Sequence, residues 1–151
     1  MRVAIDTSVL VALFVPNDTW RSQAATLVND LRQRQASIIY FDCVVAEALS
    51  AAVRRLHERR QSQRIPAILE RFRHELPGTA HNLDSSRHRA IVRTDPRFGG
   101  KSNGALNFHD ALIALACQER EIAAIASFDP DFDQVPWLSR LASTEESSRG
   151  T

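Results

Sequence analysis

The strongest constraint on the fold is the alternation of short strand-like runs with long stretches of helical periodicity. Residues 2–6, 37–41 and 122–127 are predicted as strands, and the last is apolar enough to lie in a sheet covered on both faces. Helical sequence separates consecutive strands, and strands joined by helical crossovers run parallel. The chain is therefore predicted to adopt an α/β fold, a three-layer α/β/α sandwich around a central, mostly parallel sheet.

The helices are identified by apolar residues at helical spacing and by polar residues suited to cap them. Residues 111–117 are apolar on every face of the last helix, so we expect that helix to be buried. Candidate N-caps stand where three of the helices begin, and these are Thr7 or Ser8, Asp42, and Asn107. Helices are predicted over residues 7–14, 22–36, 42–60, 66–76, 86–92 and 108–121.

Three of these helices carry an apolar stripe that we expect to face the core. A stripe arises because side chains three or four residues apart lie on one face of a helix. The predicted stripes are Ala24, Leu27, Val28 and Leu31; Val45, Leu49, Ala52, Val53 and Leu56; and Ile68, Leu69, Phe72 and Leu76.

The length of 151 residues, 44% of them apolar, suits one domain with a substantial core. We expect this domain to span residues 1–142, with residues 143–151 forming a polar, disordered tail. The longest apolar runs are seven residues, short of the ~20 needed to span a bilayer, so we expect no signal peptide and no membrane association. Cys43 and Cys117 lie in apolar stretches without metal-binding spacing, which fits a cytoplasmic protein with free thiols.

The formal net charge of +1 conceals an uneven distribution of charge along the chain. Residues 48–97 contain eleven basic and five acidic side chains, whereas residues 98–151 contain four basic and eight acidic ones. Of the nineteen basic residues, eighteen are Arg. Either a codon bias towards Arg or a surface for nucleic-acid backbone explains this composition, because guanidinium groups pair with phosphate oxygens in a bidentate manner.

Carboxylates are predicted to gather at one edge of the sheet. Asp6 ends the first strand, Asp129 follows the last strand by two residues, and Asp110 lies in the first turn of the buried helix. In an open α/β sheet, ligands bind at the carboxyl ends of the strands, so these three acids map to the ligand-binding edge. A fourth acid, Glu47, lies near the start of the helix that follows the second strand.

Each of these acids also has a local structural explanation. Asp6 is suited to cap the helix that follows it, and Asp110 is suited to an Asn107-capped first turn. Asp129 precedes a proline, and Asp-Pro commonly starts a turn. Glu47 points nearly opposite the predicted stripe of its own helix, which favours a solvated position.

The acids constrain function more strongly as a group than singly. Two carboxylates ~4 Å apart repel by roughly 4 kcal/mol near a protein surface, against a total domain stability of ~5–15 kcal/mol. Convergence of three or four therefore requires protons or cations. Oxygen ligands without a Cys/His set favour a hard cation, Mg²⁺ with Mn²⁺ as a substitute, and such a site suits phosphodiester chemistry with a metal-activated water.

Four segments in order resemble the PIN domain family, and within it the VapC-like toxin ribonucleases of type II toxin–antitoxin pairs. The segments are IDTSVL, VVAEALSAAVRR, LNFHDALIALA and IASFDPDFDQVPWL, and the resemblance extends over residues 2–141. It implies a homodimer that cuts structured RNA, tRNA or rRNA, with Mg²⁺ as cofactor, and that is neutralised by a cognate antitoxin. It also implies that the catalytic and metal-binding residues are Asp6, Glu47, Asp110 and Asp129, with Ser8 as a supporting polar residue.

Several polar residues near these segments are given other roles. We expect His109, beside Asp110, to contribute to the helix cap, with RNA contact as the alternative. Asp131 and Asp133 are interpreted as residues of a loop and a helix start rather than as ligands. Possible contacts to the RNA backbone are Arg93, Arg97 and Lys101, in a loop that is otherwise simply solvated.

Other proteins that place acids at this edge fit the sequence less well. An aspartate-nucleophile phosphatase needs Asp-x-Asp after the first strand, and the second position here is Ser8. A receiver module needs a lysine at the site, for which Lys101 is the sole candidate, and a dinucleotide-binding domain needs a GxGxxG that this chain lacks. The remaining alternative is a non-catalytic PIN-like module that binds RNA or protein.

Overall fold

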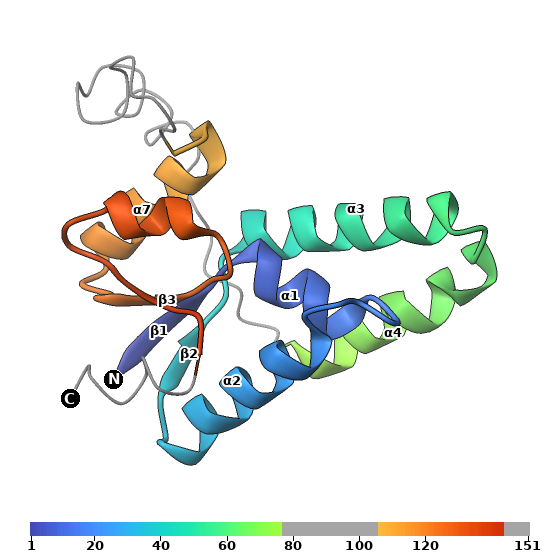
Figure 1. Ribbon diagram of the computed structural model, residues 1–151, viewed down its shortest axis with the longest axis horizontal. Helices are drawn as coiled ribbons and strands as arrows, with labels where there is room; N and C mark the ends of the chain where they lie inside the picture. Colours follow the sequence, from blue (N-terminus) through green and yellow to red (C-terminus); the bar gives the residue numbers. More distant parts are fainter. Residues whose placement is uncertain (77–105, 144–151) are drawn as a thin grey trace.

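The computed structural model describes residues 1–76 and 106–143, which form a sheet with helices on both faces (Figure 1). The sheet has the strand order β2-β1-β3-β4, and every pairing in it is parallel. The predicted α/β sandwich is thus confirmed, with a sheet that is entirely parallel. The strands are β1 (Arg2–Ile5), β2 (Ser37–Ile39), β3 (Ala124–Ala126) and β4 (Ser139–Leu141).

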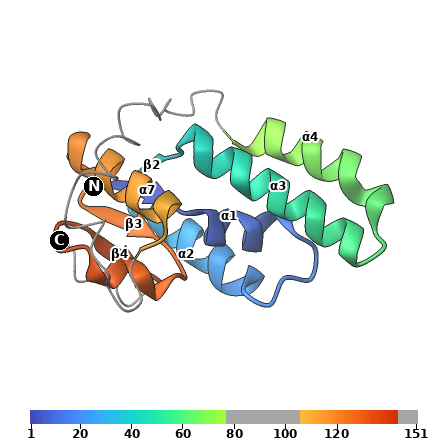
Figure 2. The ribbon, with the colours of Figure 1, turned by 90° about the horizontal axis from the view of Figure 1, so that it is seen from above.

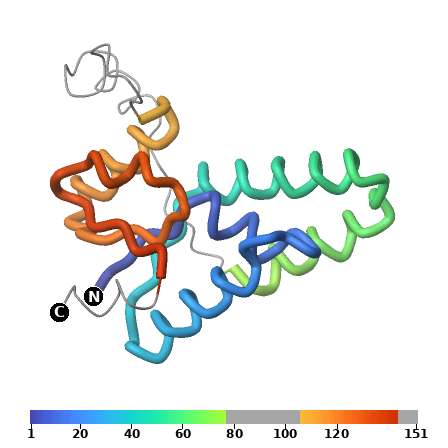
Figure 3. Tube along the Cα trace, in the orientation of Figure 1, coloured from blue at the N-terminus to red at the C-terminus, as the bar shows by residue number. Residues whose placement is uncertain are grey.

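Helices cover the two faces of the sheet unequally. Helix α7 lies on one face, whereas α1 and α2 lie on the other and α3 and α4 extend away beside them (Figures 1 and 2). The chain path in Figure 3 leaves β1 through α1 and α2 and returns to β2. The helices are α1 (Thr7–Phe14), α2 (Arg21–Gln33), α3 (Asp42–Glu58), α4 (Ile65–Glu75) and α7 (Phe108–Glu119), with short 3-10 turns η1 (Ser62–Arg64) and η2 (Pro130–Gln134).

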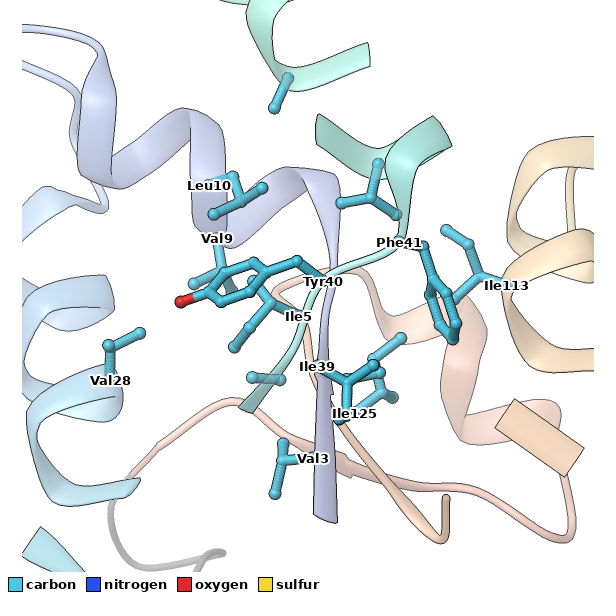
Figure 4. Close-up of a cluster of buried hydrophobic side chains, with 14 of the residues drawn as sticks. Val3, Ile5, Val9, Leu10, Val28, Ile39, Tyr40, Phe41, Ile113 and Ile125 are labelled. Atoms are coloured by element: carbon cyan, nitrogen blue, oxygen red, sulfur yellow. The ribbon is translucent and has the colours of Figure 1, made fainter. Parts of the chain in front are cut away.

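The core is built on both sides of the central strands (Figure 4). At the end of β2, the adjacent Tyr40 and Phe41 point to opposite sides, as alternating side chains of an extended chain do. Tyr40 lies towards Val9 of α1, and Phe41 lies towards Ile113 of α7. All four side chains are buried, so one extended segment anchors a helix on each face.

Of the three predicted apolar stripes, one is buried in full and two are corrected. The stripe of α2 is buried as predicted, but Leu69 of α4 is 41% exposed while its neighbours Ile68 and Phe72 are buried. In α3 the buried face is rotated about the helix axis from the predicted one and shares Ala52 and Leu56 with it. It consists of Val44, Ala48, Ala52 and Leu56.

Two of the three predicted caps are also corrected. Asp6 itself caps α1, in place of Thr7 or Ser8, and Phe41 rather than Asp42 occupies the N-cap position of α3. Asn107 caps α7 as predicted, because its side chain accepts hydrogen bonds from the backbone of the first turn.

Three helices end with a residue other than glycine in the left-handed region. Gln35, Arg60 and Glu121 have φ of 57°, 56° and 55°. In each case the next residue donates its N–H to a carbonyl in the last turn, with N···O distances of 2.8–2.9 Å. The sequence prediction extended α2 too far because a glycine, the usual mark of such an end, is missing there.

Some predictions concern residues outside the described ranges. The helix expected over residues 86–92 and the tail beyond residue 143 both lie there, as do Arg93, Arg97 and Lys101. Within the described residues, the helices are all too short or too polar to cross a membrane.

The same substitution at two leucines tests the burial of the helices. Leu27 of α2 is fully buried, so Leu27→Ala should lower the free energy of unfolding by about 2–5 kcal/mol. Leu69→Ala, on the exposed face of α4, should cost less than about 1 kcal/mol. Urea denaturation of both variants measures the difference, and equal losses would contradict the packing of α2 described above.

Candidate metal centre

The site lies where the strand order reverses. From β1 the chain passes to β2 on one side and later to β3 on the other, so the carboxyl ends of β1 and β3 border a topological switch point. Ile5 pairs with Ala126 in the register of these strands. The residues that follow, Asp6 and Ser127, are therefore neighbours, and the backbone N–H of Asp6 donates to the Ala126 carbonyl at 3.0 Å.

Asp6 is both a helix cap and part of this edge. Its carboxylate is 4% exposed, and the Oδ2 atom accepts from the Ser8 N–H at 3.3 Å and from the Ser8 hydroxyl at 2.7 Å. The Ser127 hydroxyl donates to the same oxygen at 2.8 Å. Two hydroxyls and one amide thus hold the buried carboxylate in one orientation, which compensates for its removal from water.

The loop after β3 supplies two further carboxylates. The Asp129 N–H donates to Ser127 Oγ at 3.0 Å, and Asp129 Oδ1 accepts from the Asp131 N–H at 2.9 Å. This local turn places the side chains of residues two apart on the same side of the loop. Phe132, fully buried in the core, anchors the turn to the fold.

Asp110 is the third member of the cluster and enters from α7. Asn107 Oδ1 accepts from the His109 and Asp110 N–H groups at 2.9 and 3.0 Å, which positions Asp110 in the first turn. Asp110 is 6% exposed, and its Oδ2 atom is buried with no hydrogen-bond partner among the described residues. One carboxylate oxygen each from Asp110, Asp129 and Asp131 lies within 4.8 Å of the others.

Electrostatic repulsion is concentrated on Asp110. Its pKa is raised from 3.8 to about 7, first by burial and then by the surrounding carboxylates. Those carboxylates, in order of their effect, are Asp6, Asp129, Glu47 and Asp131. The helix dipole, which favours a negative charge in this first turn, is too weak to offset them.

Glu47 is exposed on α3, as helix periodicity predicted, and it also lines the same cavity. The buried face of α3 is rotated roughly 60° from the predicted stripe towards Glu47, which lies roughly 60° from Val44 at the edge of that face. Its side chain is half-exposed, and Oε2 accepts from the Thr7 hydroxyl at 2.7 Å. His109 Nε2 lies 2.8 Å from the same oxygen without forming a hydrogen bond, and the contact is an ion pair only when the imidazole is protonated.

The structure therefore brings the acids of the sequence prediction together and adds another. A cavity of about 640 Å³ is lined by Asp6, Ser8, Glu47, Asp110 and Asp129, among other residues. Asp131 lies at the start of η2, as predicted, and one of its carboxylate oxygens also lies within 4.8 Å of those of Asp110 and Asp129, which the sequence did not indicate.

Neighbouring polar residues divide between the site and its surroundings. Asp133 lies outside the cluster, as predicted, and forms a two-pronged ion pair with Arg140 at 2.8 and 2.9 Å. The sequence analysis did not identify Ser127 and Thr7 as residues of the site. Their position directly beside the strand ends was the feature that could have identified them.

A divalent cation fits the donor set. The three clustered ligands are carboxylate oxygens, which hard cations prefer, and Asp110 contributes a buried oxygen that has no hydrogen-bond partner in the part of the chain that the structure describes. The ligand atoms of an octahedral Mg²⁺ site are ~3 to ~4.2 Å apart, so these oxygens, which lie within 4.8 Å of one another, would move closer together around a bound cation. A bound cation would also remove the repulsion that raises the pKa of Asp110.

Comparison with known proteins yields one match. A family model described as PIN domain matches residues 3–138. Neither the search of curated proteins nor the search of solved structures finds a match.

The raised pKa of Asp110 predicts how stability depends on pH without a metal. Because the folded pKa of about 7 exceeds the unfolded value of 3.8, the folded state holds its proton more tightly, and stability falls as pH rises between these values. The loss is complete above pH 7 and amounts to roughly 4 kcal/mol. In EDTA, Asp110→Asn should therefore exceed the wild type in stability, by more at pH 8 than at pH 5.

Thermal unfolding of both proteins at the two pH values measures this difference. Added Mg²⁺ should reduce the advantage of Asp110→Asn at pH 8, because the cation binds the wild-type carboxylate. A variant that is less stable than the wild type in EDTA at pH 8 would show that Asp110 is held by favourable contacts instead.

Proposed function

The chain belongs to the PIN domain family, and we propose that it is a Mg²⁺-dependent endoribonuclease toxin that hydrolyses phosphodiester bonds in structured RNA, tRNA or rRNA. The observation that carries this proposal is the convergence of carboxylates on a buried, unpartnered oxygen of Asp110. PIN domains are generally metal-dependent nucleases, and a cluster of this kind fits that chemistry.

The residues of the site divide into three roles in this proposal. Asp110, Asp129 and Asp131 hold the cation, with Asp6 completing the acidic site beside them. Mg²⁺, or Mn²⁺ in its place, would polarise the scissile phosphate and lower the pKa of a water molecule. Ser8 and Ser127 keep Asp6 in its orientation through their hydroxyls.

Glu47 is suited to orient the attacking water. It is the most exposed of the acids that line the cavity from which substrate would enter. Its two contacts, to the Thr7 hydroxyl and the His109 ring, restrict the carboxylate to one position without burying it. An oriented acceptor of this kind holds a water molecule in line with the phosphorus.

Positive charge for the RNA backbone comes from α3. Arg54 and Arg55 of α3 line the same cavity as the acidic cluster. Guanidinium groups pair with phosphate oxygens, so these two residues are suited to hold nucleotides that flank the scissile bond.

The biological setting follows from the resemblance to VapC-like toxins. We propose a cytoplasmic homodimer that is neutralised by a cognate antitoxin, with a segment of the antitoxin occupying the cavity. The open cavity of about 640 Å³ supports this proposal, since it has room for several inserted side chains.

Removal of the metal and substitution of one aspartate both test the proposed reaction directly. Purified protein should cleave total tRNA or rRNA in Mg²⁺ or Mn²⁺ and lose this activity in EDTA. Asp6→Asn should reduce the cleavage rate by at least ~100-fold, because it changes the acid at the centre of the hydroxyl network. Gel analysis of the RNA over time measures both effects.

Asp133→Asn is the matched control, because it makes the same substitution just outside the cluster. Its rate should remain within about twofold of the wild type, since Asp133 pairs with Arg140 rather than facing the other acids. Cleavage that persists in EDTA would sink the mechanism. Binding without cleavage in any metal would favour a non-catalytic module.

The proposed dimer predicts the mass in solution. Light scattering during size exclusion should give twice the chain mass of 16.9 kDa at micromolar concentration. A mass of one chain at every concentration tested would contradict the dimer and leave the nuclease proposal untouched.

A further inference from the structure

A large exposed aromatic side chain stands beside the acidic cluster. Trp20, which immediately precedes α2, is 50% exposed and stacks on Phe128, with ring centroids 5.2 Å apart and planes 26° from parallel. The described residues include four large exposed apolar side chains, and of these Trp20 alone lines the cavity of the acids. Phe128 also lines it, directly before Asp129.

The loop that carries Trp20 is held firmly against α3. The Asp18 carboxylate accepts from the Trp20 N–H at 2.9 Å and from the Arg55 guanidinium. Arg59 donates to the Pro16 carbonyl at 2.9 Å, which ties the start of the loop to the same helix. The indole is therefore preorganised at the cavity wall, and a partner that stacks on it loses little entropy in ordering the protein.

The exposed part of this indole is apolar surface that a ligand could cover. A tryptophan gains most when its large apolar surface is buried, yet half of this one remains exposed next to charged groups. One side of the ring is supported by Phe128, and the exposed part borders a cavity that also contains Arg54 and Arg55. Aromatic surface beside cations and a phosphate-binding centre is the combination that binds unpaired nucleotides.

We propose that Trp20, supported by Phe128, is a base-stacking subsite that binds an unpaired base of the nucleic-acid strand while its phosphate lies at the acidic cluster. The position of the phosphate in this inference rests on the proposed nuclease function, whereas the stacking of the base on Trp20 does not. The subsite takes a base that is already unstacked from its neighbours, because a base inside a duplex presents no free face.

Equilibrium binding to two strands tests the subsite. The Asp6→Asn protein, which binds without rapid cleavage, is titrated with a fluorescein-labelled single-stranded RNA and with an abasic strand of equal length and charge. Trp20→Ala in this background should weaken binding of the RNA about tenfold and change binding of the abasic strand less than about twofold. Trp20→Phe should keep most of the affinity, and Leu69→Ala, an exposed apolar residue on α4, should change neither.

The intrinsic tryptophan fluorescence of the protein gives a second readout, which does not require that the Trp20→Ala variant folds. Of the two tryptophans, Trp137 is half-buried and donates its indole N–H to the Ala114 carbonyl, so Trp20 is the one available for stacking. The RNA should quench the emission, and the abasic strand should not.

Each outcome separates the subsite from the nuclease proposal. If the wild type does not cleave RNA but Trp20→Ala still weakens binding of the base-bearing strand alone, the subsite stands and the nuclease proposal fails. Cleavage with no effect of Trp20→Ala on binding overturns the subsite instead. Equal losses on the two strands, absence of quenching, or no measurable binding of the RNA also overturns it.

Discussion

The parallel pairing of β1 with β3 is the contact on which the whole site depends. Because Ile5 stands opposite Ala126, the next residues on each strand, Asp6 and Ser127, meet at the sheet edge. The Ser127 hydroxyl then connects the buried Asp6 carboxylate to the backbone of Asp129. A slip of one residue in this register would turn the Ser127 side chain to the other face and break its hydrogen bond to Asp6.

The cluster built on this pairing opposes the stability of the fold. Asp110 is buried within reach of four other carboxylates, and an ionised group there is unfavourable without a compensating charge. The rest of the molecule supports this arrangement through an apolar helix, α7, that is buried along most of its length. Repulsion between carboxylates that a well-packed core holds together at a cavity is typical of a cation-binding site before the cation binds.

Much of the fold could be predicted from local patterns. The strand positions, the Asn107 cap and the burial of α7 follow from periodicity and side-chain chemistry that act within a few residues. Strand β4 was missed, because three residues at the edge of the sheet carry too little pattern to distinguish them from a loop. The predicted apolar stripe of α4 wrongly included Leu69, because the exposure of a helix residue depends on which other helix packs against that face.

The sequence by itself determined which residue types end the strands and begin the helices, and so which acids could meet at one edge of a parallel sheet. Tertiary structure decided which acids meet and how closely. Helical spacing alone placed Glu47 in solvent, and loop chemistry alone left Asp131 outside the group. Trp20 joins the cavity because Asp18 and Arg55, distant in sequence, fasten its loop to α3. The physical reason is that local propensities act over a few residues, whereas convergence depends on strand register and helix packing between distant segments.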